Sequence, residues 1–224
     1  DLAVVLRGYD NFNQAVMLTS TVAADGAFVF DAVPDASGRQ YMLTLDYAGL
    51  AYGSDIFNFE AGREVKGLAM TVYESTTDTS ALRIERLHLA AAEAGSGGPL
   101  TFSELVLFGN QGDRTISPTD GIEVPLPQGA TAVAVQGLVE GNDYTRTADG
   151  IRLLWPVRPG PSSAQISFTF QLPVGAAADF SQRVAYPVQA LDVAVAETMT
   201  VAGDGLQDRG TESLQNNIVH AYSG

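Results

Sequence analysis

The stretch Ala15–Val33, "AVMLTSTVAADGAFVFDAV", decides the fold that we predict for this chain. Two β-rich runs flank the pair Asp25-Gly26, which suits a tight type I′ turn because both central residues of that turn need a positive φ. In the second run Phe28 and Phe30 are two residues apart, so they lie on one face of a strand. The stretch therefore predicts a β-hairpin with one buried face.

Further strands are predicted up to about residue 74. In "QYMLTLDY" the apolar side chains Tyr41, Leu43 and Leu45 alternate with polar ones, and "KGLAMTVYE" reads as a closing strand. The polar stretch that follows, "ESTTDTS", separates two strand-rich regions. We therefore predict a sandwich over residues 1–74, a linker over 75–80 and a larger domain over 81–224.

The larger domain shows the same short alternating runs, separated by Pro and Gly. In "AQISFTFQL" the residues Ile166, Phe168 and Phe170 share one face, while the polar residues share the other. The alternation of "ALRIERLHLAA" changes phase near Glu85 and Arg86. The turn spacing is typical of an Ig-like sandwich of roughly seven to nine strands. The predicted fold class is all-β, with two tandem β-sandwich domains.

The composition argues against several classes of partner. The chain has 26 acidic and 12 basic residues and a net charge of -14, which disfavours nucleic acid and anionic membranes. No run reaches the roughly 18 apolar residues of a membrane span. Without Cys there is no disulfide or thiolate metal site. The β-rich composition, with Lys66 as its only lysine, favours an exported protein, extracellular or at the cell surface.

A family resemblance covers about the first third of the chain. It rests on residues that run from the predicted hairpin to the closing strand: Thr21, Asp25, Gly26, Phe28, Phe30, Tyr41, Leu43, Leu45, Gly49 and Gly62. This region resembles the carboxypeptidase regulatory-like domain, a transthyretin-like β-sandwich of many surface proteins. The resemblance implies an accessory or scaffold role without catalytic residues. The second domain is more loosely similar to β-sandwich regions of bacterial envelope proteins.

The resemblance also implies that a first strand precedes "LAVVLRG", so the domain is expected to lack it. Such a gap would expose unpaired backbone groups, which a strand from another copy can fill. Trimming of the chain, or a strand supplied by another segment, are the alternatives. The candidate exchange segments lie at the two ends and carry Leu2, Val4, Leu6, Leu214, Ile218 and Tyr222. We therefore expect a homopolymer, the structural subunit of an extracellular filament or surface assembly.

No pattern in the sequence indicates an enzyme, and we predict no catalytic residue, cofactor or metal. His88 and His220 lack the sequence spacing of a pair of metal ligands. The loops "GNDYTRTADG" and "AGDGLQDRG" do not match a calcium-binding ladder, so each is taken as a solvated turn. Lys66 is expected to be a surface residue rather than part of a Lys–Asn cross-link. The sequence leaves one alternative open, a pair of catalytic carboxylates that the fold brings together, as in a glycosidase.

Aromatic residues provide the alternative function, a ligand- or carbohydrate-binding module of a larger anchored protein. They could line a sugar platform, although aromatics at alternating strand positions are more often core. The aromatics concerned are Tyr9, Phe12, Tyr47, Tyr52, Phe57, Phe59 and Trp155.

Overall fold

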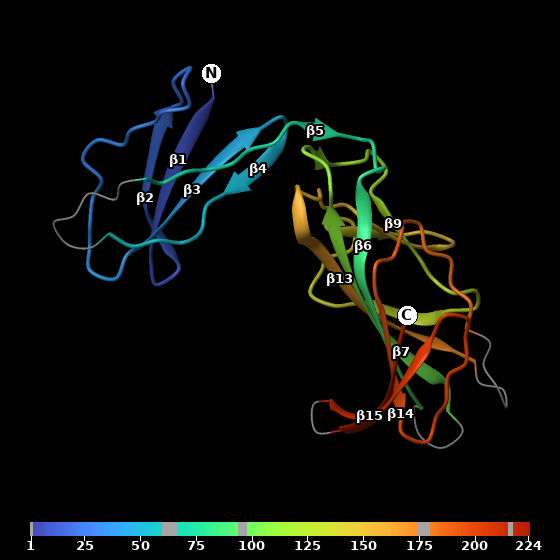
Figure 1. The fold of residues 1–224 in the computed structure, drawn as a ribbon. Helices are drawn as coiled ribbons and strands as arrows, with labels where there is room; N and C mark the ends of the chain where they lie inside the picture. Colours follow the sequence, from blue (N-terminus) through green and yellow to red (C-terminus); the bar gives the residue numbers. More distant parts are fainter. Residues whose placement is uncertain (1, 60–66, 94–97, 174–179, 215–216) are drawn as a thin grey trace. The chain divides into compact units, whose positions relative to one another are not determined.

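The computed structural model describes residues 2–59, 67–93, 98–173, 180–214 and 217–224. In these residues every regular element is a β-strand, which confirms the predicted all-β class (Figure 1). The chain divides into two compact units, Asp1–Glu74 and Ser75–Gly224, which are described separately below. The described residues contain no helix that is long and apolar enough to cross a membrane.

Unit 1 is built on one four-stranded antiparallel sheet in the order β2-β1-β3-β4. Its strands are β1 (Ala3–Asp10), β2 (Asn13–Thr21), β3 (Gln40–Tyr47) and β4 (Leu50–Gly53). Alternation places one apolar set on a buried face: Val4, Leu6, Tyr41, Leu43, Leu45 and Tyr52. A two-residue turn, Asn11–Phe12, joins β1 to β2 with φ of 46° and 68°, as a type I′ turn requires.

Two strands predicted for this unit are not formed. A turn forms here, because the Gly26 N–H donates to the Ala23 carbonyl at 2.9 Å. It is not the predicted type I′ turn, because Gly26 has a φ of +87° but Asp25 does not have a positive φ. However, neither residues 27–33 nor residues 67–74 belong to a strand. Their side chains still alternate between exposed and half-buried. The period of two therefore correctly indicated extended segments that pack against a core, but it did not indicate whether they pair with another strand.

Unit 2 contains a seven-stranded sheet in the order β10-β13-β7-β6-β14-β16-β15. Its strands are β6 (Leu82–Glu93), β7 (Leu100–Asn110), β10 (Thr131–Val135), β13 (Gly160–Leu172), β14 (Leu191–Ala196), β15 (Gln207–Leu214) and β16 (Asn217–Ser223). The predicted apolar face of β13 is buried, with Ile166, Phe168 and Phe170 at most 1% exposed. Strand β14 pairs with β6 in parallel, and the other neighbours in the sheet are antiparallel.

Two smaller sheets complete unit 2. Strands β9 (Ile122–Pro125), β11 (Tyr144–Arg146) and β12 (Gly150–Leu153) form one, and their apolar residues share a core with the large sheet. Strands β5 (Ser75–Thr76) and β8 (Thr115–Ile116) form the other. Ser75 and Thr76 therefore pair within unit 2, although the sequence assigned them to a linker over 75–80. The short polar run gave no sign of this distant partner.

The phase change predicted in β6 is a β-bulge. The register with β7 shifts between Ile84 and Arg86, which leaves Glu85 as the extra residue. The Glu85 carboxylate accepts hydrogen bonds from the Ser162 N–H at 2.7 Å and the Ser162 hydroxyl at 3.1 Å. A Cβ at Gly109 would lie 2.2 Å from Glu85 Oε1, so only glycine leaves room for this side chain.

Two other predictions for unit 2 were wrong. The alternation of "QRVAYPV" (182–188) predicts a strand, but these residues form only an isolated bridge, from Val188 to Ile84. The stretch "AGDGLQDRG" (202–210) was expected to be a solvated turn, but residues 207–210 belong to β15, which pairs with β16. Pairing with a neighbour outweighed local composition at β15.

Candidate functional site: the cover of unit 1 and a cavity in unit 2

Two segments without strand structure cover the buried face of the unit 1 sheet. We name residues 27–33 the first cover segment and residues 67–73 the second cover segment. Their half-buried side chains that pack on the core are Phe28, Phe30, Val33, Leu68, Met70, Val72 and Tyr73. One face of the unit 1 core is thus closed partly by side chains of irregular segments, where a sandwich would place a second sheet.

The cover segments make few backbone hydrogen bonds. In the first, the Ala27 N–H donates to Asp25 Oδ1 at 3.0 Å and the Val29 N–H to Ser20 Oγ at 3.2 Å. In the second, the Tyr52 hydroxyl donates to the Tyr73 carbonyl at 2.9 Å. Among the described residues, no backbone hydrogen bond joins the segments, and the backbone of residues 68–72 has no partner.

Such a segment can accept an added strand. In the described part of the chain its backbone donors and acceptors at residues 68–72 have no partner, and its side chains already alternate with a period of two, with Leu68, Met70 and Val72 facing inward. An incoming strand would gain main-chain hydrogen bonds and would place alternate side chains toward the same core. Unit 1 therefore carries the geometry of a strand acceptor.

The structure places the predicted exchange residues of the N-terminus in the centre of a sheet. Strand β1 lies between β2 and β3. Val4 and Leu6 are each 1% exposed, and Leu2 is half-buried against the same core. Donation of this segment would remove the middle of unit 1, so β1 is poorly placed as a donor.

The predicted exchange residues of the C-terminus are divided between two strands. Leu214 ends β15, the edge strand of the large sheet, while Ile218 and Tyr222 lie on β16, between β14 and β15. Tyr222 is 5% exposed, but Leu214 and Ile218 are more than half exposed. These three residues belong to unit 2, whereas the N-terminal three belong to unit 1.

An exposed apolar patch lies at the β1–β2 turn of unit 1. Phe12 has 97% of its surface exposed and Ile56 has 64%. They border a hollow of about 220 Å³ that is also lined by Tyr9, Gln40, Tyr41 and Met42. Phe12 is the one aromatic of the predicted sugar platform that stands almost fully in solvent. By contrast, Tyr52 is buried, and the rings of Phe57 and Phe59 pack against Tyr41.

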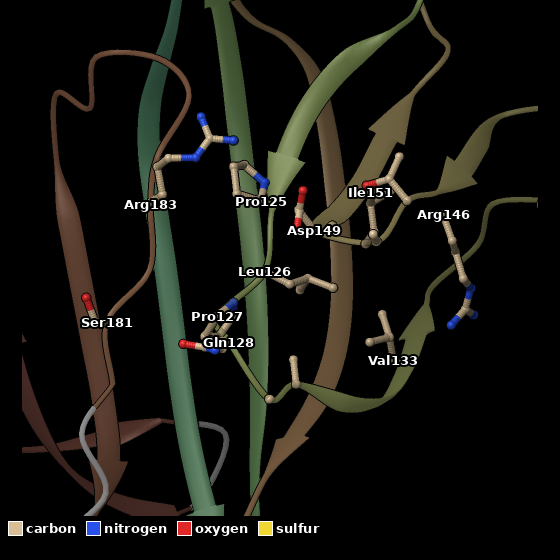
Figure 2. A pocket seen from close by; sticks show the side chains of 15 residues that line it. Pro125, Leu126, Pro127, Gln128, Val133, Arg146, Asp149, Ile151, Ser181 and Arg183 are labelled. Atoms are coloured by element: carbon tan, nitrogen blue, oxygen red, sulfur yellow. The ribbon is translucent and has the colours of Figure 1, made fainter.

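Unit 2 has a surface cavity of about 680 Å³ beside β9 and β12. Figure 2 shows Arg183 and Arg146 on opposite sides of it, with Asp149 between them. Arg146 pairs with Glu140 at 3.1 Å, and Arg183 pairs with Glu123. Apolar side chains complete the lining, among them Leu126, Val133 and Ile151. The cavity can offer cations, a carboxylate and an apolar floor to one ligand.

A buried carboxyl group lies next to the wall of this cavity. Glu104 on β7 is 1% exposed, and its Oε1 accepts a hydrogen bond from Gln182 Nε2 at 3.1 Å. The same Gln182 nitrogen donates to the carbonyl of Pro125 at 2.8 Å. The second carboxyl oxygen, Oε2, has no partner. Burial raises the pKa of Glu104 to about 7, while the hydrogen bond from Gln182 opposes this rise.

Sequence reasoning missed Glu104, although a signal was present. In "LTFSELVLF" the residue occupies the same phase as Phe102 and Val106, so a glutamate stands where the alternation demands an apolar side chain. The sequence contains no comparable signal for Gln182, because its segment is not a paired strand in which alternation would assign the side chain to the core.

The histidines lie apart in the structure, each beside a carboxylate. His88 Nδ1 is 3.3 Å from Asp192 Oδ2, and His220 Nε2 is 2.7 Å from Asp208 Oδ1. In the described part of the chain, no group of three or more His, Cys, Asp or Glu side chains could hold a metal ion. Lys66 lies outside the described residues.

Asp143, one of the two acidic residues of the loop "GNDYTRTADG", has a structural role. Asp143 accepts hydrogen bonds from the Val139 N–H at 2.8 Å and from Trp155 Nε1 at 3.0 Å. These bonds lower the pKa of Asp143, the backbone bond most strongly. Trp155, a member of the predicted sugar platform, is thus anchored at the 139–143 turn and remains 40% exposed.

The comparisons with known proteins do not name a family. No protein-family model matches the chain, and no curated protein sequence matches it. Among solved structures, a mutant of an M1 zinc metallopeptidase from Deinococcus radiodurans is similar at 15% identity and a TM-score of 0.33. The match covers 64% of this chain and 39% of that one. At this TM-score the likeness carries no argument about the present chain.

Proposed function

We propose that this chain is a structural subunit of an extracellular filament or surface assembly, in which copies are joined by β-strand pairing. The observation that supports this proposal is the second cover segment. Its backbone at residues 68–72 has no partner among the residues that the structure describes, while its side chains lie on the core. A free extended edge pairs readily with another strand. The resemblance to a scaffold domain and the composition of an exported protein support the same function.

If each copy gives a strand to the next one, the contact is heterologous and builds an open fibre. Backbone hydrogen bonds would then supply most of the contact energy, and these depend little on salt. The net charge of -14 would oppose lateral association at low salt and less so at high salt. Fibres are therefore expected at low and high salt, with lateral bundling only at high salt.

Proline substitutions at the free edge test the proposal. Thr71→Pro and Met70→Pro each remove an N–H that has no partner among the described residues, and neighbouring N–H groups of an extended segment point to opposite sides. We expect at least one of them to weaken assembly about tenfold or more, because each blocks one side of the segment. Negative-stain electron microscopy and light scattering, at low and high salt, provide the measurement.

The matched controls are Thr71→Ala and Met70→Leu, which keep the N–H groups and should assemble like the native chain. The proposal would be wrong if both proline variants assembled as well as their controls. It would also be wrong if the natively isolated protein remained a monomer at every salt concentration.

The cavity of unit 2 supports a second candidate, a ligand- or carbohydrate-binding module. The Asp149 side chain lines the cavity and has no hydrogen bond or ion pair in the described part of the chain, so its carboxylate can accept hydrogen bonds from sugar hydroxyls. Saturable glycan binding by the monomer, lost in Asp149→Ala and kept in Asp204→Ala on a distant exposed turn, would favour this function. No binding on a glycan array would oppose it.

A further inference from the structure

A strap without strand structure closes the core of unit 2 beside the cavity. We name residues 180–188 the closing strap. The Phe180 ring stacks on Phe102 with 5.1 Å between ring centroids, and the Tyr186 ring packs edge-on against Phe108 at 6.1 Å. Ser181 and Arg183 of the strap form part of the cavity wall. The strap thus covers apolar core on one side and faces a ligand-sized space on the other.

Side chains, and not a strand ladder, hold the middle of the strap. Arg183 pairs with Glu123, and the Tyr186 hydroxyl accepts a hydrogen bond from the Glu123 N–H at 3.1 Å. Gln182 lies between Phe180 and Arg183 in the strap, and its side chain donates hydrogen bonds to Glu104 and to the Pro125 carbonyl. Glu104 is therefore the anchor that the large sheet offers to this part of the strap.

The surroundings of Glu104 are apolar on every packed element. Its cross-strand neighbours are Leu89 on β6 and Phe168 on β13, and Phe102 and Val106 flank it on β7. The charged groups next to these positions have other partners: His88 faces Asp192, and Arg183 faces Glu123. No charged group therefore compensates an ionised Glu104, and its Oε2 has no hydrogen bond.

We propose that Glu104 is a proton-operated latch on the closing strap. With the proton on Glu104, the carboxyl group is neutral, accepts the hydrogen bond from Gln182 and holds the strap over the core. When the proton passes to solvent, an unpaired charge is left in an apolar site, which is costly. Release of the strap lets water reach the carboxylate, and the same movement opens the cavity wall at Ser181 and Arg183.

The latch operates near neutral pH, because burial raises the pKa of Glu104 to about 7. This inference does not depend on the proposed assembly, since it concerns a group, a strap and a cavity that all lie in unit 2. It predicts that the exposure of the Phe180 aromatic stack and the shape of the cavity both depend on pH.

Hydrogen exchange followed by mass spectrometry tests the latch on the full chain. Protection of residues 180–188 is compared at about pH 5.5 and about pH 8.5, after correction for the chemical exchange rate. We expect protection to fall about tenfold or more at the higher pH in the native chain. Glu104→Gln keeps a neutral side chain at both pH values, so its strap should be protected equally at both.

Glu93→Gln is the matched control, because it makes the same substitution at an exposed glutamate and should leave the native pH dependence intact. The latch would be disproved by strap protection that does not change with pH in the native chain. It would equally be disproved by an unchanged pH dependence in Glu104→Gln.

A direct titration keeps the inference testable if Glu104→Gln does not fold. Carbon NMR of the glutamate carboxyl groups in the native chain should show one that titrates near pH 7, with strap protection falling as the pH rises from about 4.5 to that midpoint and level above it. Titration of every glutamate near the ordinary value of 4.5 would contradict the latch.

Discussion

The two units differ in how completely they bury their cores. Unit 2 encloses 23 buried residues between its sheets, with Ile122, Ile151 and Phe168 among those that are fully buried. Unit 1 has six buried core residues and closes over them with 14 side chains that are only partly buried. Strands therefore close most of the unit 2 core, with the closing strap as an exception, whereas irregular cover segments close one face of the unit 1 core.

This difference shows that alternation and pairing are separate properties. Both units contain extended segments with a period of two, but strands in unit 2 meet partners, whereas the cover segments of unit 1 do not. Because buried apolar area supplies most of the folding free energy, unit 2 should be the more stable unit. Unit 1 has the most to gain from an added strand.

The largest expected effect compares a core phenylalanine in each unit. Phe168→Ala should lower the unfolding free energy of unit 2 by about 3–5 kcal/mol, because it empties a fully buried site. Phe30→Ala in the half-buried cover should cost unit 1 only about 1–2 kcal/mol. Urea unfolding is followed by the fluorescence of Trp155, the only tryptophan, for unit 2, and by NMR signals of residues in unit 1.

Each substitution should leave the transition of the other unit in place. If both reporters moved together in both variants, the two units would unfold as one cooperative body, and the comparison between them would fail.

The next effect concerns pH and unit 2 alone. The pKa of Glu104 is raised in the folded state, so folding takes up a proton and the stability of unit 2 falls as pH rises from about 4.5 to about 7. The expected loss is roughly 3 kcal/mol, after which the curve is level. Asp143 and Asp208 have lowered pKa values and act with the opposite sign, but at lower pH.

Urea midpoints across this pH range provide the measurement. The decline should be absent in Glu104→Gln and absent from the unit 1 transition. A unit 2 curve that rises with pH over the same window would contradict the assignment.

The smallest effect should stabilise unit 1. Phe12 has a φ of 68° and is almost fully exposed, so its side chain adds strain without burial. Phe12→Gly should raise the unfolding free energy of unit 1 by about 1 kcal/mol, because glycine adopts positive φ freely. A Met17→Gly control in the adjacent strand should destabilise the same unit. Equal or lower stability in Phe12→Gly would indicate that Phe12 contributes packing that its exposure does not reveal.

The sequence predicted features that depend on local alternation. The buried face of Ile166, Phe168 and Phe170 was correct, and so was the disturbance at Glu85. These succeeded because a period of two, and a break in it, are properties of one strand. The same periodicity failed for residues 27–33 and 67–74, because a ladder also needs a neighbour that no local pattern encodes.

The candidate sites were less accessible to prediction. The exchange residues Leu214 and Ile218 are exposed, but strand β16, which carries Ile218, is paired on both sides with strands that no local pattern identifies. The link from Glu104 to Gln182 joins positions far apart in sequence through a side chain. Only Glu104, a charged residue at a position where the strand alternation calls for an apolar one, could have been noticed from the sequence.

The parallel pairing of β14 with β6 has a consequence for the order in which the chain folds. Leu191 lies opposite Leu87, about a hundred residues earlier, and β6 has only β7 as a neighbour until β14 arrives. Contacts of such long range slow folding, and ribosomes add only about 5–20 residues per second. An open β6 edge therefore exists for several seconds or more in every newly made copy. Translocation in an unfolded state, or a chaperone that shields this edge, would spare the cell premature aggregation.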